Sequence, residues 1–122
     1  MQLDFNSDIP IYLQLKQAIE DDIVSGIFKE ESQIPSTTEI SLTYKINPAT
    51  VGKGFNLLVD EGILVKKRGV GMFVKTGARG ALLEKRRDAF FNTYVQNLMK
   101  EAKRLGITLD EIINMLKRGE KQ

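Results

Sequence analysis

The stretch STTEISLTYKINPATVGKGFNLLVD, residues 36–60, contains the start signals of two short helices. Ser36 and Glu39 have the spacing of a capping box, in which each side chain accepts a hydrogen bond from the backbone N–H of the other residue. An extended run, Gln33-Ile34-Pro35, leads into this box. The pattern predicts a first helix over residues 37–44.

The second start signal follows after a short link, residues 45–47. Asn47 is a strong N-cap, and Pro48 suits the first helical position, where a missing N–H breaks no hydrogen bond. Two short helices joined by such a link predict a helix-turn-helix. Apolar residues at the spacing of one helix face extend the second helix over residues 48–61: Val51, Phe55, Leu58 and Val59.

Two runs of strand-forming residues follow the second helix, at residues 63–65 and 72–74. The glycine-containing segment between them, residues 66–71, predicts a β-hairpin. A hairpin directly after a helix-turn-helix is the wing of a winged helix, and its basic tip is expected over phosphates or in the minor groove. The expected contacts at this tip come from Lys66, Lys67, Arg68 and Gly69, where the glycine allows close backbone approach.

Another helix is predicted ahead of this unit, over residues 10–25. Ser7 or Asp8 is its expected side-chain cap. Gly26 follows its last turn, where a left-handed residue is favoured. Its inward face is expected to consist of Tyr12, Leu15, Ile19 and Ile23.

The C-terminal third of the chain is also expected to be helical. After a short linker at residues 76–80, one long helix is predicted over residues 82–105. Thr108 and Glu111 form a second capping box, which begins a last helix. The broad apolar face of the two helices consists of Leu83, Phe90, Phe91, Tyr94, Val95, Leu98, Ala102, Leu105, Ile112, Ile113 and Leu116, of which the last three are expected to face inward.

Two helices cannot bury so broad an apolar face by themselves. Either the face meets a second copy of the chain, or the helices fold back as a hairpin that completes the core. The clustered aromatic residues favour self-association. The expected interface residues are Leu83, Phe90, Phe91, Tyr94, Leu98, Leu105, Ile112, Ile113 and Leu116.

The composition excludes several functional classes. The chain of 122 residues is 42% hydrophobic and 28% charged, which is ordinary for a folded protein. It contains neither cysteine nor histidine, so disulfides, thiolate nucleophiles and imidazole bases or ligands are excluded. Its 16 carboxylates are scattered, and we expect no catalytic activity. There is no membrane-spanning run and no secretory signal, so a cytoplasmic location and no membrane partner are expected.

Basic residues are concentrated in one band of the sequence. Residues 66–87 contain eight lysines and arginines and one acid, Glu84, a local charge of +7, whereas the net charge of the chain is only +2. Such a band is typical of a surface that meets phosphates, although a solvated charged face gives the same pattern.

Six short motifs occur in a fixed order along residues 9–75. They are Pro10-Ile11-Tyr12-Leu13-Gln14-Leu15, Gly26, Ile34-Pro35-Ser36 with Glu39, Thr50-Val51, Glu61-Gly62, and Gly69-Val70-Gly71-Met72-Phe73-Val74. This ordered set resembles the GntR family of bacterial transcription regulators. The segment Asn47–Val51 and the short helical C-terminus resemble the YtrA subfamily of that family.

The resemblance implies a homodimer, a palindromic operator and, often, relief of repression by a ligand. It also implies DNA contacts at the start of each helix of the helix-turn-helix and at the wing glycine. Carried over to this sequence, the contacts are Ser36, Thr38 and Glu39, then Asn47, Pro48, Thr50 and Lys53, and then Gly69.

The sequence departs from the family pattern at three positions. Thr38 stands where the family usually has an arginine that contacts DNA, and Glu30-Glu31 stands where a Pro-Gly turn is common. Pro48 replaces an arginine seen in many relatives, as it does in the YtrA subfamily. Base recognition is therefore expected to depend on Asn47, Thr50, Lys53 and Asn56. Lys53 can donate to guanine or to phosphate, and Asn56 can pair with adenine.

We therefore expect a mainly α-helical protein with a small β-hairpin. Residues 1–76 are predicted to form a winged helix-turn-helix DNA-binding domain, and residues 77–122 a two-helix dimerisation region. The predicted function is that of a sequence-specific regulator, most simply a repressor, with double-stranded DNA and a second copy as partners. No cofactor or metal is expected, and a small-molecule effector remains open. The alternatives are a winged-helix protein-interaction module and a ligand sensor with weak DNA binding.

Overall fold

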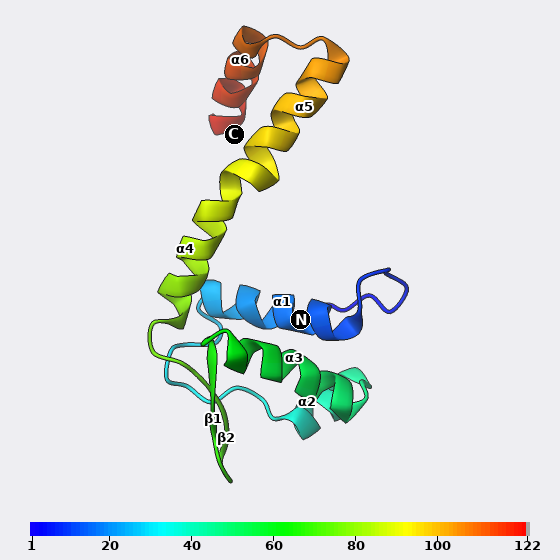
Figure 1. The fold of residues 1–122 in the computed structure, drawn as a ribbon, viewed down its shortest axis with the longest axis vertical. Coiled ribbons are helices and arrows are strands. Elements are labelled where there is room, and N and C mark those ends of the chain that lie inside the picture. Colours follow the sequence, from blue (N-terminus) through cyan, green and yellow to red (C-terminus); the bar gives the residue numbers. More distant parts are fainter. Residues whose placement is uncertain (122) are drawn as a thin grey trace. The chain divides into compact units, whose positions relative to one another are not determined.

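The computed structural model describes residues 1–121. They form two compact units, residues 1–84 and residues 85–121. We call them the winged-helix unit and the C-terminal unit. The fold is mainly helical with one antiparallel hairpin, as predicted (Figure 1). The elements in order are α1 (Ile11–Val24), α2 (Thr37–Tyr44), α3 (Pro48–Asp60), β1 (Leu64–Lys67), β2 (Gly71–Val74), α4 (Ala78–Phe90), η1 (Phe91–Val95), α5 (Gln96–Leu105) and α6 (Leu109–Glu120).

The two helices of the helix-turn-helix begin at their predicted caps. The Ser36 Oγ accepts a hydrogen bond from the Glu39 N–H at 3.0 Å, and Glu39 Oε1 accepts one from the Ser36 N–H at 3.1 Å. The Asn47 side chain accepts a hydrogen bond from the Ala49 N–H at 2.9 Å, with Pro48 at the first helical position. Lys45 ends α2 in the left-handed conformation, with φ 56°. The predicted capping box and N-cap are thus confirmed.

The expected cap of α1 is wrong. No side chain caps this helix, and Pro10 precedes it in an extended conformation. The Ser7 Oγ accepts a hydrogen bond from the Ile9 N–H instead, so it is engaged before the helix begins. Gln14 organises this end of the unit, because its amide donates to the Ile9 carbonyl at 2.7 Å and its oxygen accepts from the Asp4 N–H at 2.8 Å.

The wing has a third backbone segment beside its two strands. β1 pairs with β2 in a register that places Val65 opposite Phe73 and Lys66 opposite Met72. Residues 31–34 run along the free edge of β2, with the Ile34 N–H donating to the Met72 carbonyl at 2.9 Å. The segment that leads into α2 therefore also holds the wing.

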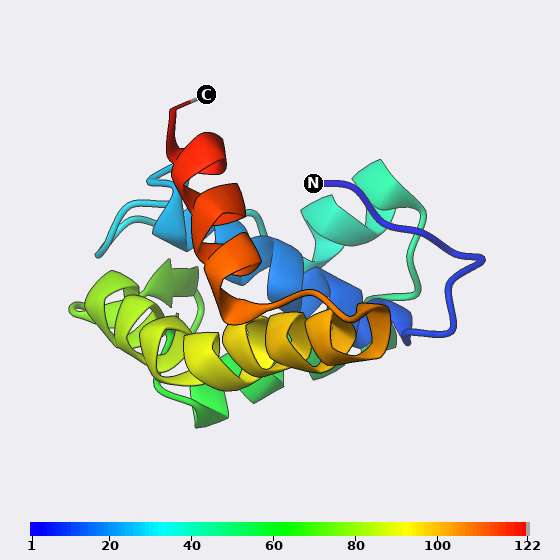
Figure 2. The same cartoon turned by 90° about the horizontal axis from the view of Figure 1, so that it is seen from above.

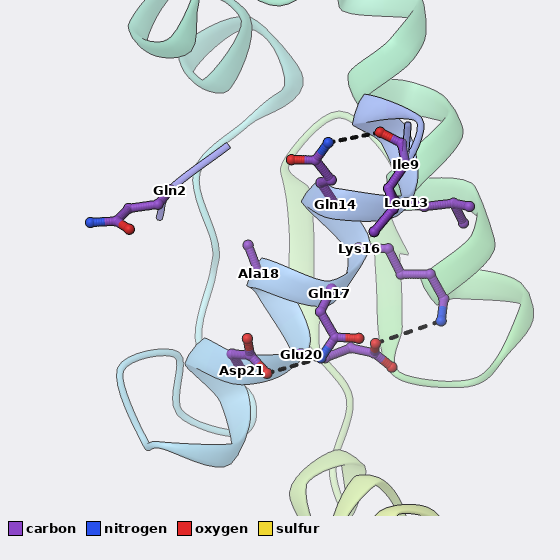
Figure 3. Close-up of a pocket in the computed structure, with 9 residues that line it drawn as sticks. All are labelled: Gln2, Ile9, Leu13, Gln14, Lys16, Gln17, Ala18, Glu20 and Asp21. Atoms are coloured by element: carbon purple, nitrogen blue, oxygen red, sulfur yellow. Dashed lines mark hydrogen bonds and ion pairs between the residues drawn. The ribbon is translucent and has the colours of Figure 1, made fainter. Parts of the chain in front are cut away.

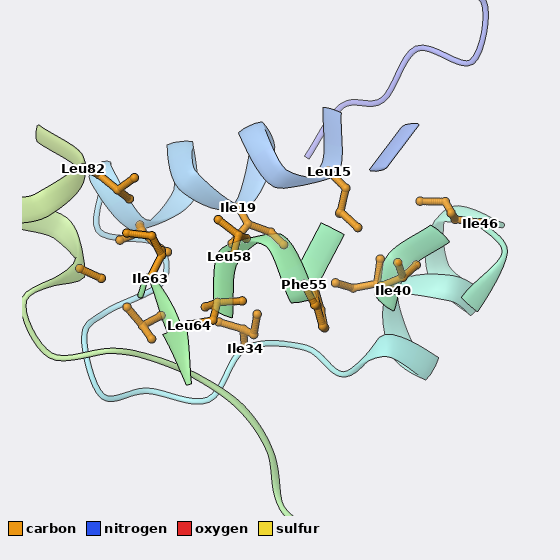
Figure 4. Close-up of a cluster of buried hydrophobic side chains, with 14 residues drawn as sticks. Leu15, Ile19, Ile34, Ile40, Ile46, Phe55, Leu58, Ile63, Leu64 and Leu82 are labelled. Atoms are coloured by element: carbon orange, nitrogen blue, oxygen red, sulfur yellow. The ribbon is translucent and has the colours of Figure 1, made fainter. Parts of the chain in front are cut away.

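The core of the winged-helix unit lies between α1, α2, α3 and the base of the wing (Figure 4). Leu15, Phe55 and Leu58 are fully buried in it. Gly54 lets α1 and α3 approach closely, because a Cβ there would lie 3.0 Å from the Tyr12 carbonyl oxygen. The predicted inward faces of both helices are confirmed, apart from Tyr12 and Val59, which are only partly buried.

The predicted linker at residues 76–80 is wrong in its second half. α4 begins at Ala78, and Ala78 and Leu82 are both buried in the core of the winged-helix unit. The two residues lie one helical turn apart, so their burial stabilises a helix through Gly80 in spite of the low helix propensity of glycine.

α4, η1 and α5 follow one another without a break, but the predicted long helix is not a regular α-helix. η1 is a π-helical turn, in which the Gln96 N–H bonds to the Phe91 carbonyl. The Asn97 side chain donates to the Thr93 carbonyl at 2.7 Å and so supports this turn. Such turns arise where one extra residue is accommodated within a helix.

The C-terminal unit buries few side chains. The second capping box is confirmed, with the Thr108 Oγ1 accepting from the Glu111 N–H at 3.2 Å, and α6 follows a short loop after α5 (Figure 2). Ala102 and Ile112 are the buried residues among those described in this unit. Ile113 and Leu116 are exposed, so the expectation that they face inward holds only for Ile112 within a single chain.

Candidate nucleic-acid interface

A groove of about 350 Å³ on the winged-helix unit brings three predicted elements together. The start of α2, the outer side of α3 and the wing each supply part of its wall. Its lining includes four predicted DNA contacts: Ser36, Thr38, Asn56 and Lys66. Gly52, which sequence reasoning missed, also lines it, and a Cβ there would meet nothing within 4 Å. The groove is therefore open above the middle of α3.

The strand register separates the two wing lysines. Lys66 shares a face of the hairpin with Leu64 and Met72, the face that packs on the core and borders the groove. Lys67 lies on the opposite face with Phe73, and its Nζ lies 4.2 Å from the centre of the Phe73 ring. Adjacent residues of a strand point to opposite faces. Only one of these two neighbouring charges therefore borders the groove.

Other predicted contacts on α3 lie outside the groove lining. Asn47 and Pro48 form the exposed start of the helix, and Thr50 is partly buried. The Lys53 Nζ lies 4.0 Å from the centre of the Tyr12 ring in α1, a cation–π geometry. Lys53 is exposed, but its ammonium already has a partner within the chain.

The tip of the wing is exposed at Lys66, Lys67, Arg68 and Gly69. Gly69 has φ 77° and Gly71 has φ 145°, backbone conformations that residues with a Cβ rarely adopt. Gln33, which sequence reasoning treated only as part of an extended run, donates from its Nε2 to the Val70 carbonyl at 2.9 Å.

The acidic pair that replaces the Pro-Gly turn is engaged within the winged-helix unit. Glu31 adopts φ 67° and accepts a hydrogen bond from the Thr76 hydroxyl at 3.1 Å. Glu30 accepts one from the Arg79 N–H, in the first turn of α4, at 3.2 Å. The Arg79 Nε also donates to the Val24 carbonyl at 2.9 Å. The pair thus holds the start of α4, a role that sequence reasoning missed.

The two units differ in net charge. Residues 1–84 contain nine basic and eleven acidic residues, a net charge of −2, whereas residues 85–122 carry +4. The carboxylates of α1 contribute to the negative balance, and Lys16 lies between two carboxylates, 3.6 Å from Glu20 and 3.1 Å from Glu61. The densest positive charge of this unit lies at the wing, where Lys66, Lys67 and Arg68 are consecutive.

The structure has another depression, of about 400 Å³, along α1 (Figure 3). It is lined by residues such as Ile9, Leu13 and Gln17, and by none of the predicted site residues. Within residues 1–121, no group of three or more carboxylates could hold a metal ion. No helix in that part of the chain is long and apolar enough to cross a membrane.

The predicted interface residues of the C-terminal unit remain exposed in the single chain, with two exceptions. Phe90, Phe91 and Tyr94 are more than half exposed, and the rings of Phe90 and Tyr94 lie 5.3 Å apart. Leu98, Leu105, Ile113 and Leu116 are also exposed. Ile112 is buried within its own chain, and Leu83, in the winged-helix unit, is partly buried.

The helix-turn-helix, the hairpin after it and the groove between them define a winged helix-turn-helix protein of the DNA-binding type. The model of the GntR family of bacterial regulatory proteins matches residues 11–74, which include all these elements. This chain belongs to the GntR family. That family consists of bacterial regulatory proteins.

The chain is similar over almost its whole length to one of its relatives. It is 29% identical to the HTH-type transcriptional repressor YtrA of Bacillus subtilis over 117 residues, which cover 96% of this chain and 89% of YtrA. It is 39% identical to the uncharacterized HTH-type regulator YurK of the same organism over 74 residues, but these cover 61% of this chain and only 31% of YurK. The similarity to YtrA therefore includes the C-terminal unit.

Solved structures show the same fold. A GntR-family regulator from Bacteroides thetaiotaomicron is 33% identical, with a TM-score of 0.73 over 91% of this chain and 96% of that protein. The DNA-binding domain of AraR, solved in complex with an operator, is 26% identical, with a TM-score of 0.56 over 61% of this chain and 95% of that domain.

Proposed function

We propose that this protein is a homodimeric transcription repressor of the cytoplasm that binds a palindromic operator through its winged helix. Residues 1–76 bind DNA, and residues 77–122 form the dimer. The observation that carries this proposal is the groove where the start of α2, the outer side of α3 and Lys66 meet, within the segment that matches the family. The description of YtrA as a repressor supports the direction of regulation.

In this proposal, α3 enters the major groove with its N-terminal half against base edges. Asn56 is suited to pair with adenine, and Lys53 donates to guanine or phosphate after leaving the Tyr12 ring. Ser36, Thr38 and Glu39 lie at the start of α2, next to the backbone of the DNA. Asn47, Pro48 and Thr50 are at the start of α3, and Lys66, Lys67, Arg68 and Gly69 follow the phosphates or the minor groove.

The exposed apolar face of the C-terminal unit supports the dimer. Large side chains such as Phe91, Tyr94 and Leu105 are more than half exposed in the single chain, although they lie within about four helical turns of one another. A unit that buries so little does not offset its loss of conformational entropy by itself. A second copy presents the same face to it, which places the two recognition helices about 34–36 Å apart, or a multiple of that distance.

Fluorescence anisotropy tests the proposal directly. We expect the full-length protein to bind a duplex from the region upstream of its own gene more tightly than a scrambled duplex of the same length. The affinity should fall steeply with salt, because basic side chains release counterions from the DNA. Equal, weak binding to both duplexes at low salt, lost near physiological salt, would contradict sequence-specific repression at this site.

A second candidate function is supported by the charge of the winged-helix unit. Its net charge of −2 and the threonine at position 38 favour a ligand sensor or protein-interaction module with weak DNA binding. Such a protein dimerises normally but shifts no duplex at low salt. Sedimentation velocity with and without DNA separates this outcome from the repressor.

A further inference from the structure

Gln33 connects two parts of the proposed DNA-binding surface that are far apart in the sequence. It lies three residues before Ser36, the cap of α2. Its side chain crosses to the tip of the wing, where the Nε2 donates to the carbonyl of Val70 at 2.9 Å. The hydrogen bond therefore links the start of α2 to the loop between β1 and β2.

Gly71 of the wing leaves space for the Gln33 amide. Gly71 adopts φ 145°, and a Cβ at Gly71 would lie 2.5 Å from the Gln33 Nε2, too close for any real side chain. The backbone of Gln33 is also bridged to Phe73 in β2. Gln33 thus reaches the wing through both its backbone and its side chain, and the glycine leaves room for the side chain.

We propose that Gln33 is a positioning residue for DNA binding, which holds the wing tip at a fixed place relative to the start of α2. A two-stranded hairpin is only marginally ordered by itself, and the tip from Lys66 to Val70 is exposed and contributes nothing to the core. A tip that is already ordered before binding loses less conformational entropy when it meets DNA. This inference rests on the proposed function of the groove.

The first test measures the wing without DNA. In Gln33→Met, the side chain keeps its length but loses its donor. ¹⁵N relaxation should show greater backbone motion at the Arg68–Gly71 amides, with the rest of the winged-helix unit unchanged. Gln17→Met is the matched control, since Gln17 is an exposed glutamine that donates only within α1, to Asp21 at 3.0 Å. Unchanged tip relaxation in Gln33→Met would overturn the inference.

The second test asks whether the effect on binding acts through the wing. Gln33→Met should weaken binding to the upstream duplex by roughly threefold to tenfold, the size of one neutral hydrogen bond. The loss should disappear when Lys66, Lys67 and Arg68 are all replaced by alanine. The wing tip then has no basic side chain that Gln33 could hold in place for the DNA. An equal loss in both backgrounds indicates a general destabilisation and overturns the inference.

The two tests separate this inference from the proposed function. If the wild-type protein binds no duplex, the repressor proposal fails, yet the relaxation data still show whether Gln33 orders the tip. In that case, increased motion at the tip in Gln33→Met supports the positioning part of the inference, and unchanged motion overturns it.

Discussion

The two units of this protein differ in how they bury their apolar side chains. The winged-helix unit encloses fourteen residues in one core, among them Leu15, Phe55 and Leu58. The C-terminal unit has Ala102 and Ile112 buried among its described residues, while the aromatic side chains of α4 and η1 are exposed. The charge differs as well, with −2 on the first unit and +4 on the second.

The difference indicates that the two units are stable for different reasons. A unit with its own core unfolds with a free energy that does not depend on protein concentration. A unit whose apolar face is covered by a second copy gains stability by mass action, so its stability rises with concentration. The winged-helix unit should therefore tolerate loss of the dimer, whereas the C-terminal unit should not.

The largest effect is expected from truncating the core. Phe55→Ala should lower the free energy of unfolding by about 3–5 kcal/mol, because Phe55 is fully buried and leaves a cavity between α1 and α3. Urea denaturation followed by circular dichroism at two protein concentrations measures this loss, which should be the same at both. Phe91→Ala is the counterpart in the C-terminal unit, with a ring that is 57% exposed in the single chain.

Phe91→Ala should change stability only where the dimer is populated. If Phe91→Ala costs as much as Phe55→Ala in a protein kept monomeric by dilution, the C-terminal unit has a core of its own. The contrast between the two units would then be wrong.

A smaller but still large effect is expected on the dimer. Placing two carboxylates in the exposed apolar face, with Tyr94→Glu and Leu98→Glu together, should weaken dimerisation by at least a hundredfold, about 3 kcal/mol, because charges would be buried without partners. Sedimentation velocity measures the change. The winged-helix unit should keep its helical circular dichroism spectrum.

The control for this dimer variant carries the same charges on the polar side of the same helical segment. Asn92→Glu with Gln96→Glu has the same spacing, and both residues are exposed. This control should dimerise like the wild type. Equal dissociation of the two variants would show that charge alone separates the copies, without an apolar interface at Tyr94 and Leu98.

The two wing lysines give a third prediction, within the winged-helix unit. Lys66→Ala should weaken operator binding by about 1–2 kcal/mol and reduce the salt dependence by about one released ion, since Lys66 borders the groove. Lys67→Ala removes the same charge from the opposite face and should cost less. Anisotropy at several salt concentrations compares the two variants. A greater loss for Lys67→Ala would place the DNA on the other face of the wing.

Much of the winged-helix unit could be predicted because its signals are local. The Ser36–Glu39 box, the Asn47 cap and the spacing of Val51, Phe55 and Leu58 each depend on residues a few positions apart, and all were found as predicted. The same holds for the Thr108–Glu111 box. Capping and amphipathic periodicity depend on residues that are close together in the sequence, so a single sequence is enough to identify them.

The features that could not be predicted depend on contacts across the chain. Gln33 and Val70 are 37 residues apart, and Glu30 and Arg79 are 49 apart, so no local pattern joins them. The early start of α4 was hidden because Gly77 and Gly80 resemble a linker, while the burial of Ala78 depends on tertiary packing. The π-helical turn at residues 91–95 was hidden as well, since its aromatic residues fit an α-helix equally well.

The smallest prediction concerns backbone strain in the winged-helix unit alone. Lys45 ends α2 with φ 56°, a conformation that a residue with a Cβ adopts at a cost of about 1–2 kcal/mol. Lys45→Gly relieves this strain but adds freedom to the unfolded chain, so we expect a net stabilisation of about 0.5–1 kcal/mol. Lys29→Gly, at an exposed lysine without positive φ, should instead destabilise slightly. Thermal unfolding measures both changes, and sedimentation should give the same dimer dissociation constant for each. A change in that constant with Lys45→Gly would mean that the two units are coupled, because a local increase in the stability of the helix-turn-helix would then alter the affinity of the dimer.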